Sequence, residues 1–388
     1  MSADLITTPD AANSNNMGSA SLDSSDFESI LQQSIQRGAS DIHVTEGQVV
    51  SLRVGGEIQS ASSRVVDSAL FNCFLDERLS LEQRKRFAER GAIDGVLAGP
   101  ANNRFRFNLY KSGGRHSLAL RHLQNRFFGL DELGLSDQLY QLCDLRDGLV
   151  LVAGPTGSGK STTLATLINH INENRNAHII TIEDPVEFTH SKIKSIVNQR
   201  QVGCDTVDFN QALLDALRQD PDVILVGEIR DLDTIRTAIT AAETGHLVFA
   251  TVHASDCMSA IERLVSVFPG DQQQNIQHLL STTLRAVVAQ HLLVSEISKS
   301  RLQESDPRAS RNRVLASEVL RVNQAVSNLI SGGNLKQIQS VLETGTSEGM
   351  YTMDKSLAKL LRQRLISLNT AKSLARNPES LQELSRKV

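Results

Sequence analysis

Residues 148–171, GLVLVAGPTGSGKSTTLATLINHI, join an apolar run to a glycine-rich loop and then to a helical pattern. The loop GPTGSGKS (154–161) matches the pattern G-x-x-x-x-G-K-[ST] in full. It also stands where that pattern is meaningful, after a predicted strand and at the start of a predicted helix. A chance glycine-rich turn explains this combination poorly. The stretch therefore predicts a site for a nucleoside triphosphate.

Each residue type in the loop suits phosphate chemistry. Gly157 and Gly159 let backbone N–H groups approach phosphate oxygens, and the helix N-terminus favours negative charge. Lys160 supplies a positive charge for the β- and γ-phosphates, and Ser161 offers a hydroxyl to Mg²⁺. ATP and Mg²⁺ are thus the expected cofactors. The predicted nucleotide-binding residues are Gly154, Pro155, Thr156, Gly157, Ser158, Gly159, Lys160, Ser161 and Thr162.

The chain beyond Asp147 alternates strand-like and helical segments. The strand-like segments are GLVLVAGP, HIITIEDP, DVILVGE and HLVFATVH. This alternation predicts a largely parallel sheet covered by helices. The chain after about residue 260 is expected to be mostly helical, with a flexible polar loop over 295–313.

The N-terminal part has a different composition and predicts a separate small α+β domain. A helical pattern begins at Asp26, with Phe27, Ile30 and Leu31 on one face, and NRFRFNLYKSGGRHSLALRHL predicts a hairpin around its Gly-Gly turn. The expected organisation is a disordered tail over 1–25, a domain over 26–121, a linker over 122–134, and an ATPase domain over 135–388 whose helical C-terminal region covers about 260–388.

Polar side chains stand at the ends of three further predicted strands. They are Glu183 and Asp184 after HIITI, Glu228 after DVILVG, and Thr251 and His253 in HLVFATVH. A single acidic residue at a strand end is more often a helix cap than a functional group. Several such residues on successive strands favour function, because ligands bind beyond the carboxyl ends of parallel strands.

The expected roles of these residues follow from their chemistry. DVILVGE has Gly227 and Glu228 where an aspartate usually ends the strand and holds the metal. We assign Glu228 as the base, or the group that positions the attacking water. Glu183 is then expected to reach Mg²⁺ through water or to hold that water, and His253 to sense the γ-phosphate as a neutral imidazole.

The segment TGHLVFATVHASD (244–256) contains two histidines, His246 and His253. They flank one predicted strand, so they are roughly 23 Å apart, and their odd offset points them to opposite faces. They cannot bind one metal ion from that strand. A structural or subunit-contact role suits His246 best, with a direct catalytic role as the alternative.

The bulk composition excludes several classes of protein. The net charge is −4, tryptophan is absent and only 3 tyrosines occur, which argues against a nucleic-acid-binding surface. No apolar stretch is long enough to cross a bilayer. MSADLITTPD lacks a basic region followed by an apolar core, so it is not expected to be a secretory signal. Cys73, Cys143, Cys204 and Cys257 are scattered and are expected to be reduced thiols in a cytoplasmic protein.

Four ordered motifs resemble those of the secretion ATPase superfamily. GPTGSGKSTT, TIEDPVEF, DPDVILVGEIRD and TGHLVFATVHASD are similar to its Walker A, Asp box, Walker B and His box. RGASDIHVTEG, RVGGEI and the C-terminal segments AVSNLISGG and LETGTSEGMYTMDKSLAKLLRQRLIS resemble the PilT/PilU branch, the motors that retract type IV pili. The resemblance covers roughly residues 26–380.

This resemblance implies a cytoplasmic homohexameric ring in which each chain has a PAS-like N-terminal domain and a RecA-like ATPase domain. It further implies that ATP binds between the domains and that N-terminal arginines reach the phosphates, for which Arg106, Arg115 and Arg121 are the candidates. The implied partners are an inner-membrane platform protein of the pilus or secretion machine and other ring ATPases of that machine. Through them the ring would associate with the inner face of the membrane.

Two features bear on the subfamily. The chain has only Cys257 beyond the His box, so it lacks the tetracysteine zinc insert typical of type II secretion and pilus-extension ATPases. Where the retraction branch typically has the sequence AIRNLIRE, this chain has AVSNLISG (325–332). The preferred function is an ATP-driven motor for pilus retraction and twitching motility. An accessory motor, or a PilT-like ATPase of another secretion or conjugation apparatus, is the alternative.

Three other classes fit less well. A nucleic-acid translocase also uses RecA-like hexamers, but the acidic composition argues against it. An adaptor without catalytic activity conflicts with the intact Lys160 and Glu228. A small-molecule kinase would need an acceptor-binding motif or a separate lid, and the sequence shows neither.

Overall fold

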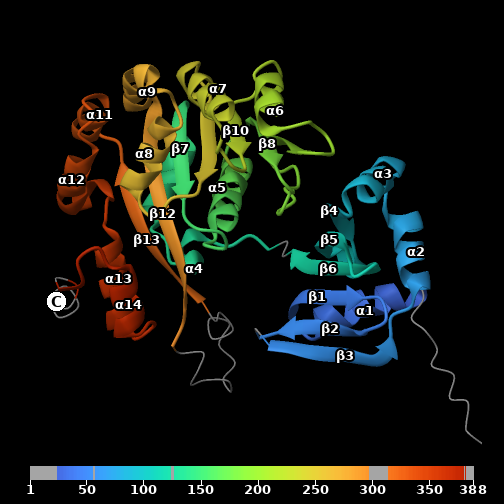
Figure 1. The fold of residues 1–388 in the computed structure, drawn as a ribbon. Coiled ribbons are helices and arrows are strands. Elements are labelled where there is room, and N and C mark those ends of the chain that lie inside the picture. Colours follow the sequence, from blue (N-terminus) through green and yellow to red (C-terminus); the bar gives the residue numbers. More distant parts are fainter. Residues whose placement is uncertain (1–23, 56, 124–125, 297–312, 380, 382–388) are drawn as a thin grey trace, which may run out of the picture. The chain divides into compact units, whose positions relative to one another are not determined.

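The computed structural model describes residues 24–55, 57–123, 126–296, 313–379 and 381. The chain divides into two compact units, residues 1–125 and 126–388, which are described separately (Figure 1). The expected tail lies outside the described residues as far as residue 23, and Ser24 and Ser25 begin the first helix. Most of the expected loop over 295–313 lies outside them as well.

The first unit is a six-stranded antiparallel sheet in the order β3-β2-β1-β6-β5-β4. One face carries the three helices, whose buried side chains include Leu31, Phe71 and Phe87. The α+β class is as predicted. The elements are α1 (Ser24–Gln36), β1 (Ala39–Thr45), β2 (Val49–Val54), β3 (Glu57–Val65), α2 (Ser68–Arg78), α3 (Leu81–Arg90), β4 (Ala92–Ala98), β5 (Arg104–Ser112) and β6 (Arg115–Leu123).

The hairpin predicted from the Gly-Gly turn is confirmed as β5 and β6. Gly113 and Gly114 have φ of 59° and 78°, which a two-residue turn matching the strand twist requires. Strand β6 extends to Leu123 and the short helix α4 occupies Leu130–Leu133. The expected linker over 122–134 therefore contains a strand end and a helical turn, because its apolar residues pack instead of remaining in solvent.

The second unit is built on a seven-stranded sheet in the order β13-β12-β7-β11-β10-β8-β9. Every pair of neighbouring strands from β12 to β9 in this order is parallel, and β13 pairs with β12 antiparallel at one edge of the sheet. The parallel sheet is therefore confirmed. The strands are β7 (Gly148–Ala153), β8 (His178–Glu183), β9 (Ile196–Gln201), β10 (Val223–Val226), β11 (Leu247–Val252), β12 (Leu284–Val294) and β13 (Arg313–Arg321).

Helices cover both faces of this sheet (Figure 1). Helix α5 and the segment before β7 pack on one face, against Val150, Val152 and Phe249. The other face, with Leu151, Ile224 and Val248, packs against helices α6 to α9, α11 and α12. Strands buried on both faces explain the unbroken apolar runs in the sequence. The helices are α5 (Lys160–Asn174), α6 (Phe209–Ala216), α7 (Leu232–Glu243), α8 (Cys257–Ser266), α9 (Gly270–Thr283), α11 (Gln324–Ser331), α12 (Ile338–Thr344), α13 (Met353–Arg362) and α14 (Leu368–Leu374).

The expected helical region after residue 260 needs correction, because it also contains strands β12 and β13. The run LRAVVAQHLLV is almost continuously apolar, and periodicity cannot separate a doubly buried strand from a buried helix. The ends of these strands, at Leu293 and Ala316, form a further core cluster with α13 and α14.

Glu318 on β13 joins two helices through one buried carboxylate. Its side chain lies in the interior, with the residue 3% exposed. One carboxylate oxygen accepts from the N–H of Cys257 at 3.0 Å and the other from the N–H of Met353 at 3.2 Å. These are the first residues of α8 and α13, where helix dipoles favour negative charge. Glu318 thus fixes the starts of both helices.

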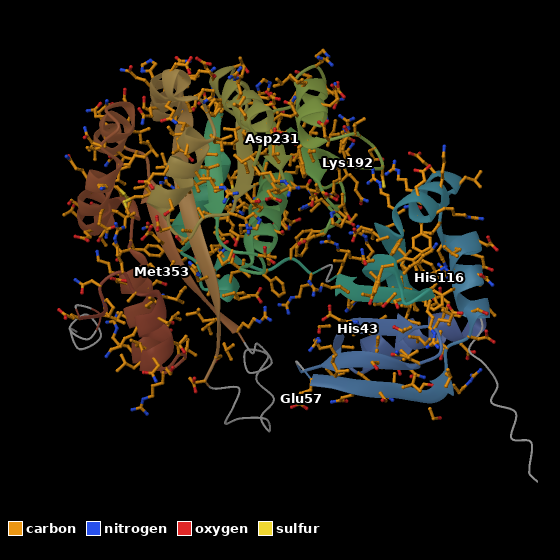
Figure 2. All side chains as sticks on the ribbon, in the orientation of Figure 1. His43, Glu57, His116, Lys192, Asp231 and Met353 are labelled. Carbon is orange, nitrogen blue, oxygen red and sulfur yellow. The ribbon has the colours of Figure 1, made fainter. Side chains whose placement is uncertain are left out.

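Helix starts also use ordinary side-chain caps, and α8 and α13 have them at Asp256 and Thr352. Asp231, labelled in Figure 2, accepts from the N–H of Thr234 at 2.9 Å and from its hydroxyl at 2.8 Å. This cap begins α7 directly after the segment that carries Glu228. All four cysteines are free thiols, and Cys143 and Cys257 are buried.

Asn172, at the end of α5, holds the connection between β8 and β9. Its fully buried amide donates to the Ser191 carbonyl at 2.7 Å. It also accepts from the N–H groups of Ile193 and Ser195 at 3.2 and 3.3 Å. One side chain therefore satisfies three backbone groups of the connection.

We expect Asn172→Leu to lower the free energy of unfolding of the second unit by about 2–4 kcal/mol, because buried backbone groups lose their partners. Urea titration monitored by circular dichroism measures this change. Asn174→Leu is the matched control, since Asn174 is exposed on the same helix. Equal stability of the two variants would contradict the role given to Asn172.

Candidate functional site

The glycine-rich loop joins β7 to α5 along a backbone path that suits glycine. Gly154, Gly157 and Gly159 have φ of 155°, 78° and 91°. A Cβ at Gly154 would collide with the Ser158 hydroxyl and the Gln290 carbonyl oxygen. A side chain at any of these positions would strain the loop.

The N-terminus of α5 is open to an anion. Gly159 is its N-cap and has no side chain with which to cap the helix. The N–H groups of the first turn lack intrahelical acceptors, and the helix dipole favours negative charge there. Pro155, Thr156 and Ser161 are exposed around this helix start, whereas Ser158 is buried.

Lys160 folds its side chain back over the loop. Its amino group donates to the carbonyl oxygens of Gly154 at 2.8 Å and Pro155 at 3.0 Å. Burial lowers the pKa of Lys160, and the charges of Glu228 and Glu187 oppose that shift. The amino group is therefore held inside the loop, with both carboxylates near enough to affect it.

Glu228 and His253 meet at the ends of neighbouring strands β10 and β11. The His253 Nε2 atom lies 3.2 Å from a Glu228 carboxylate oxygen, and an Arg230 guanidinium nitrogen lies 4.0 Å from the other oxygen. Burial lowers the pKa of His253, as does Lys160, while Glu228 raises it. Arg263 donates to the His253 carbonyl at 2.8 Å and so holds its backbone.

Thr251 connects the same two strand ends on the interior side. Its hydroxyl donates to the Gly227 carbonyl, and its own carbonyl accepts from the N–H of Ile229 at 3.0 Å. These bonds fix the backbone on both sides of Glu228. The predicted grouping of Glu228, Thr251 and His253 at one edge is therefore what the structure shows.

Glu183 ends β8 and faces a small pocket beside α5. One of its carboxylate oxygens accepts from the Thr181 hydroxyl at 2.7 Å and from the Gln199 amide at 3.2 Å. Burial raises the pKa of Glu183, and these two hydrogen bonds oppose the shift. Neighbouring Asp184 is exposed. The pocket is lined by Ser161, Leu164, Ala165, Glu183, Phe188, His190, Leu225, Gly227 and Thr251.

His190 is a buried histidine that the sequence analysis did not single out. Its ring stacks on Phe127 with centroids 4.8 Å apart, and burial lowers the pKa of His190 to about 4. Its Nδ1 atom is buried without a hydrogen-bond partner among the described residues. The ring is therefore neutral at physiological pH and lines the pocket as an uncharged group.

His246 lies at the opposite end of β11 from His253. Its Nδ1 atom is 3.0 Å from the Ala241 carbonyl and 3.3 Å from the Thr244 hydroxyl, so it contacts the last turn of α7. The six residues of β11 between the two histidines span about 20 Å. The strand between them is as predicted, and within this unit His246 is remote from the glycine-rich loop.

The three candidate arginines belong to the first unit. Arg106 on β5 and Arg121 on β6 are direct cross-strand partners, so their side chains share a face. This face is opposite the helices, since Phe105 and Phe107 on either side of Arg106 are buried in the helix-covered core. Arg115 begins β6 beside the turn, six residues before Arg121. Arg106 and Arg121 thus form a pair, and Arg115 stands apart.

Arg121 is held by a carboxylate that the sequence did not reveal. Its Nε atom donates to Asp41 on β1 at 2.9 Å, and Arg53 on β2 lies 3.9 Å from the other Asp41 oxygen. The Arg121 side chain remains 69% exposed. The guanidinium is therefore oriented by the bond from its Nε, while most of the side chain stays exposed.

Two glutamines also escaped the sequence analysis. Gln290 on β12 donates to the Thr163 hydroxyl at 2.8 Å and ties the first turn of α5 to the sheet. The side-chain amide of Gln199 on β9 donates a hydrogen bond to the Glu183 carboxylate at 3.2 Å. Neither lies in a motif, and neither segment is among the predicted strands, so the sequence carries no signal for either contact.

The fold and the site define a P-loop nucleotide-binding protein. A family model described as type II/IV secretion system protein matches residues 18–373. The chain is 38% identical to the type IV pilus retraction ATPase PilT of Pseudomonas aeruginosa, over 92% of this chain and 99% of that protein. It is 41% identical to a twitching motility protein of Neisseria gonorrhoeae, over 85% of each chain.

A solved structure of the pilus retraction motor PilT with bound ADP has a similar fold. The two match with a TM-score of 0.83 and 40% identity, over 92% of this chain and 98% of that one. The chain belongs to the type II/IV secretion system protein family, and the fold class is that of the RecA-like secretion ATPases. The family resemblance predicted from the sequence is confirmed.

The contact between Glu228 and His253 predicts how substitutions will change the pKa of His253. We expect Glu228→Gln to lower the pKa of His253, because a nearby negative charge is lost. Lys160→Met is expected to raise it, because a nearby positive charge is lost. NMR titration of isotope-labelled histidine measures both shifts. His122 in the first unit is the control and should not move, and shifts of His253 in the same direction in both variants would contradict the arrangement.

Proposed function

We propose that the chain is an ATP-hydrolysing motor that retracts a type IV pilus and thereby drives twitching motility. The observation that carries this proposal is the match to PilT proteins over nearly the whole of both chains. The complete glycine-rich loop and the paired Glu228 and His253 at the strand ends support hydrolysis. None of the described helices is long and apolar enough to cross a membrane.

The glycine-rich loop, Lys160, Glu228 and His253 have different roles in ATP hydrolysis. The N–H groups of the loop and of the first turn of α5 bind phosphate oxygens, and Lys160 turns from the loop carbonyls to the β- and γ-phosphates. Glu228 orients or deprotonates the attacking water. His253 lies against Glu228 as a neutral imidazole and senses the γ-phosphate or that water.

The donors present suit Mg²⁺, since the Ser161 hydroxyl and the Glu183 carboxylate line the same pocket and Mg²⁺ prefers oxygen ligands. Ser161 would hold the ion directly and Glu183 through water. A bound Mg²⁺ supplies charge neutralisation at the phosphates. The raised pKa of Glu183 is consistent with a buried carboxylate that has no cationic side chain beside it among the described residues.

Arginine is also proposed to stabilise the transferring phosphoryl group. Arg106 and Arg121 are the favoured pair, because they are adjacent on one face and Asp41 orients Arg121. Two parallel guanidinium donors suit phosphate oxygens. Arg115 is not part of this pair. His246 is assigned to the end of α7 or to a subunit contact.

The assembly proposed is a homohexameric ring on the inner face of the inner membrane, bound to a platform protein and to other ring ATPases of the same machine. The family resemblance supports this assembly. A motor for another secretion or conjugation apparatus is the second candidate, because α11 departs from the retraction hallmark. Its Ser327 hydroxyl donates to the Ser281 carbonyl at 2.6 Å instead of presenting a charged side chain.

Loss of Lys160 or Glu228 should abolish turnover. We expect Lys160→Ala and Glu228→Gln each to lower kcat for ATP by about 100-fold or more. Glu228→Gln should retain ATP binding, since the loop is intact. Steady-state phosphate release and calorimetric ATP binding measure these effects, with exposed Lys192→Ala and Glu262→Gln as controls. Full hydrolysis by Glu228→Gln would refute the assignment of this residue.

Deletion of the gene should separate the two candidate machines. A retraction motor predicts a strain with more surface pili and no twitching motility, rescued by the wild-type gene but not by Lys160→Ala. Electron microscopy and a subsurface twitching assay measure these traits. Normal twitching combined with defective protein export or conjugation would support the second candidate.

A further inference from the structure

We propose that Gln199, on the edge strand β9, is the residue that positions the Glu183 carboxylate. This inference rests on the function proposed above for Glu183. Gln199 is 16 residues from Glu183 in the sequence and outside every motif that the sequence analysis used.

Sheet register brings the two side chains together. Thr181 on β8 and Gln199 on β9 are direct partners in the parallel pairing. Side chains two residues apart on a strand share a face, so Glu183 follows Thr181 on the same side. The Gln199 amide therefore lies beside the Glu183 carboxylate and donates to it at 3.2 Å, while the Thr181 hydroxyl donates to the same oxygen at 2.7 Å.

Both the oxygen and the nitrogen of the Gln199 amide make hydrogen bonds. Its oxygen accepts from the N–H of His190 at 2.9 Å, and its nitrogen donates to the Phe188 carbonyl at 2.7 Å as well as to Glu183. A backbone N–H can only donate and a carbonyl can only accept, so the orientation of the amide is determined. One side chain thus links the segment after β8 to the carboxylate that ends β8.

The other Glu183 oxygen is held more weakly. Among the described residues, it accepts from the backbone N–H of Glu187 at 3.4 Å. The charge that acts on Glu183 is the negative charge of Glu187. His190, which lines the same pocket, is neutral. No cationic side chain among the described residues fixes this carboxylate, so its orientation depends on Thr181 and Gln199.

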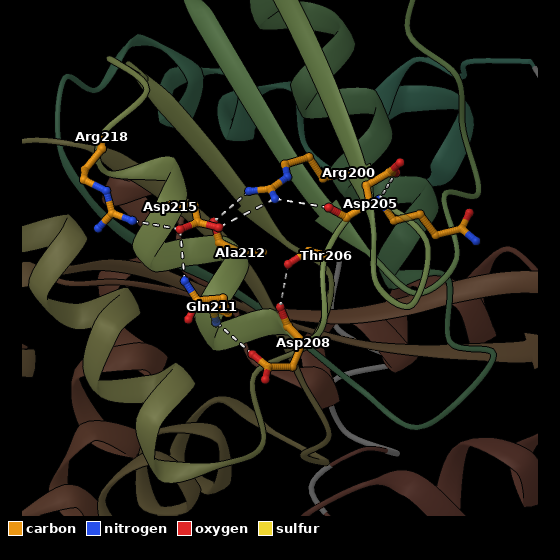
Figure 3. Close-up of polar contacts among 9 residues, drawn as sticks. Arg200, Asp205, Thr206, Asp208, Gln211, Ala212, Asp215 and Arg218 are labelled. Carbon is orange, nitrogen blue, oxygen red and sulfur yellow. Dashed lines mark hydrogen bonds and ion pairs between the residues drawn. The ribbon is translucent and has the colours of Figure 1, made fainter. Parts of the chain in front are cut away.

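Strand β9 gives Gln199 a rigid base although it is an edge strand. Arg200, on the opposite face, donates to the carbonyl oxygens of Ala212 at 3.4 Å and Asp205 at 3.3 Å, and lies 3.7 Å from Asp215 (Figure 3). These contacts tie β9 to α6. A supporting residue on a fixed strand can hold a functional carboxylate closely.

The neighbouring Gln201 provides a matched control. It stands beside Glu183 in the register, but its amide contacts the N–H of Val186 at 3.5 Å and the Cys204 sulfur at 3.3 Å. It therefore shares the strand, the face and the adjacent segment with Gln199, and differs in having no bond to Glu183.

The test compares four full-length variants with the wild type: Gln199→Met, Gln199→Glu, Gln201→Met and Gln201→Glu. Gln199→Glu keeps an acceptor for His190, removes the donor and places a second negative charge beside Glu183. We expect both Gln199 variants to lower kcat for ATP about 10- to 100-fold. The Kd for ADP, measured by calorimetry, should stay within about threefold of the wild type. The Tm of Gln199→Met is expected to fall, because the His190 N–H and the Phe188 carbonyl lose their partner. The Gln201 variants should keep kcat.

Gln199 variants with wild-type kcat would overturn the inference. So would a loss of kcat accompanied by an equal loss of ADP affinity, because a purely structural residue would have that effect. A wild-type protein that hydrolyses no ATP would contradict the proposed function itself, and this inference with it. Active wild type with active Gln199 variants would overturn the inference alone.

Discussion

Strands β7, β11, β10 and β8 run parallel in adjacent positions, so their carboxyl ends meet at one edge of the sheet. This constraint brings together groups from four separate parts of the sequence. The glycine-rich loop follows β7, His253 follows β11, Glu228 follows β10 and Glu183 ends β8. Interior packing on both faces holds the strands in register, so apolar residues far from the site determine the distances within it.

Much of this arrangement was accessible from the sequence because it is local. The loop GPTGSGKS needs only consecutive residues to identify it, and a parallel sheet then brings polar strand ends together without further information. The separation of His246 and His253 followed from strand geometry alone. The same geometry explains why one histidine contacts Glu228 and the other the end of α7.

Contacts made across large sequence separations were not accessible in this way. The Gln290–Thr163 bond joins residues 127 positions apart, and the Arg121–Asp41 pair joins residues 80 apart. Strand register determines the Arg121–Asp41 pair, and the packing of α5 on the sheet determines the Gln290–Thr163 bond. A single sequence specifies neither between distant segments. Strands β12 and β13 were missed for a related reason, since an apolar run buried on both faces carries no periodic signal.

The two bonds of Glu318 have a mechanical consequence. The same carboxylate holds the first residue of α8, four positions after His253, and the first residue of α13. A displacement of α13 away from β13 would break one of the two bonds of a carboxylate that also anchors α8, and the other carboxylate oxygen would be left in the interior without its partner. The Glu318 carboxylate therefore couples the start of α13 to the start of α8, and the short segment 254–256 connects that start to the strand end that carries His253.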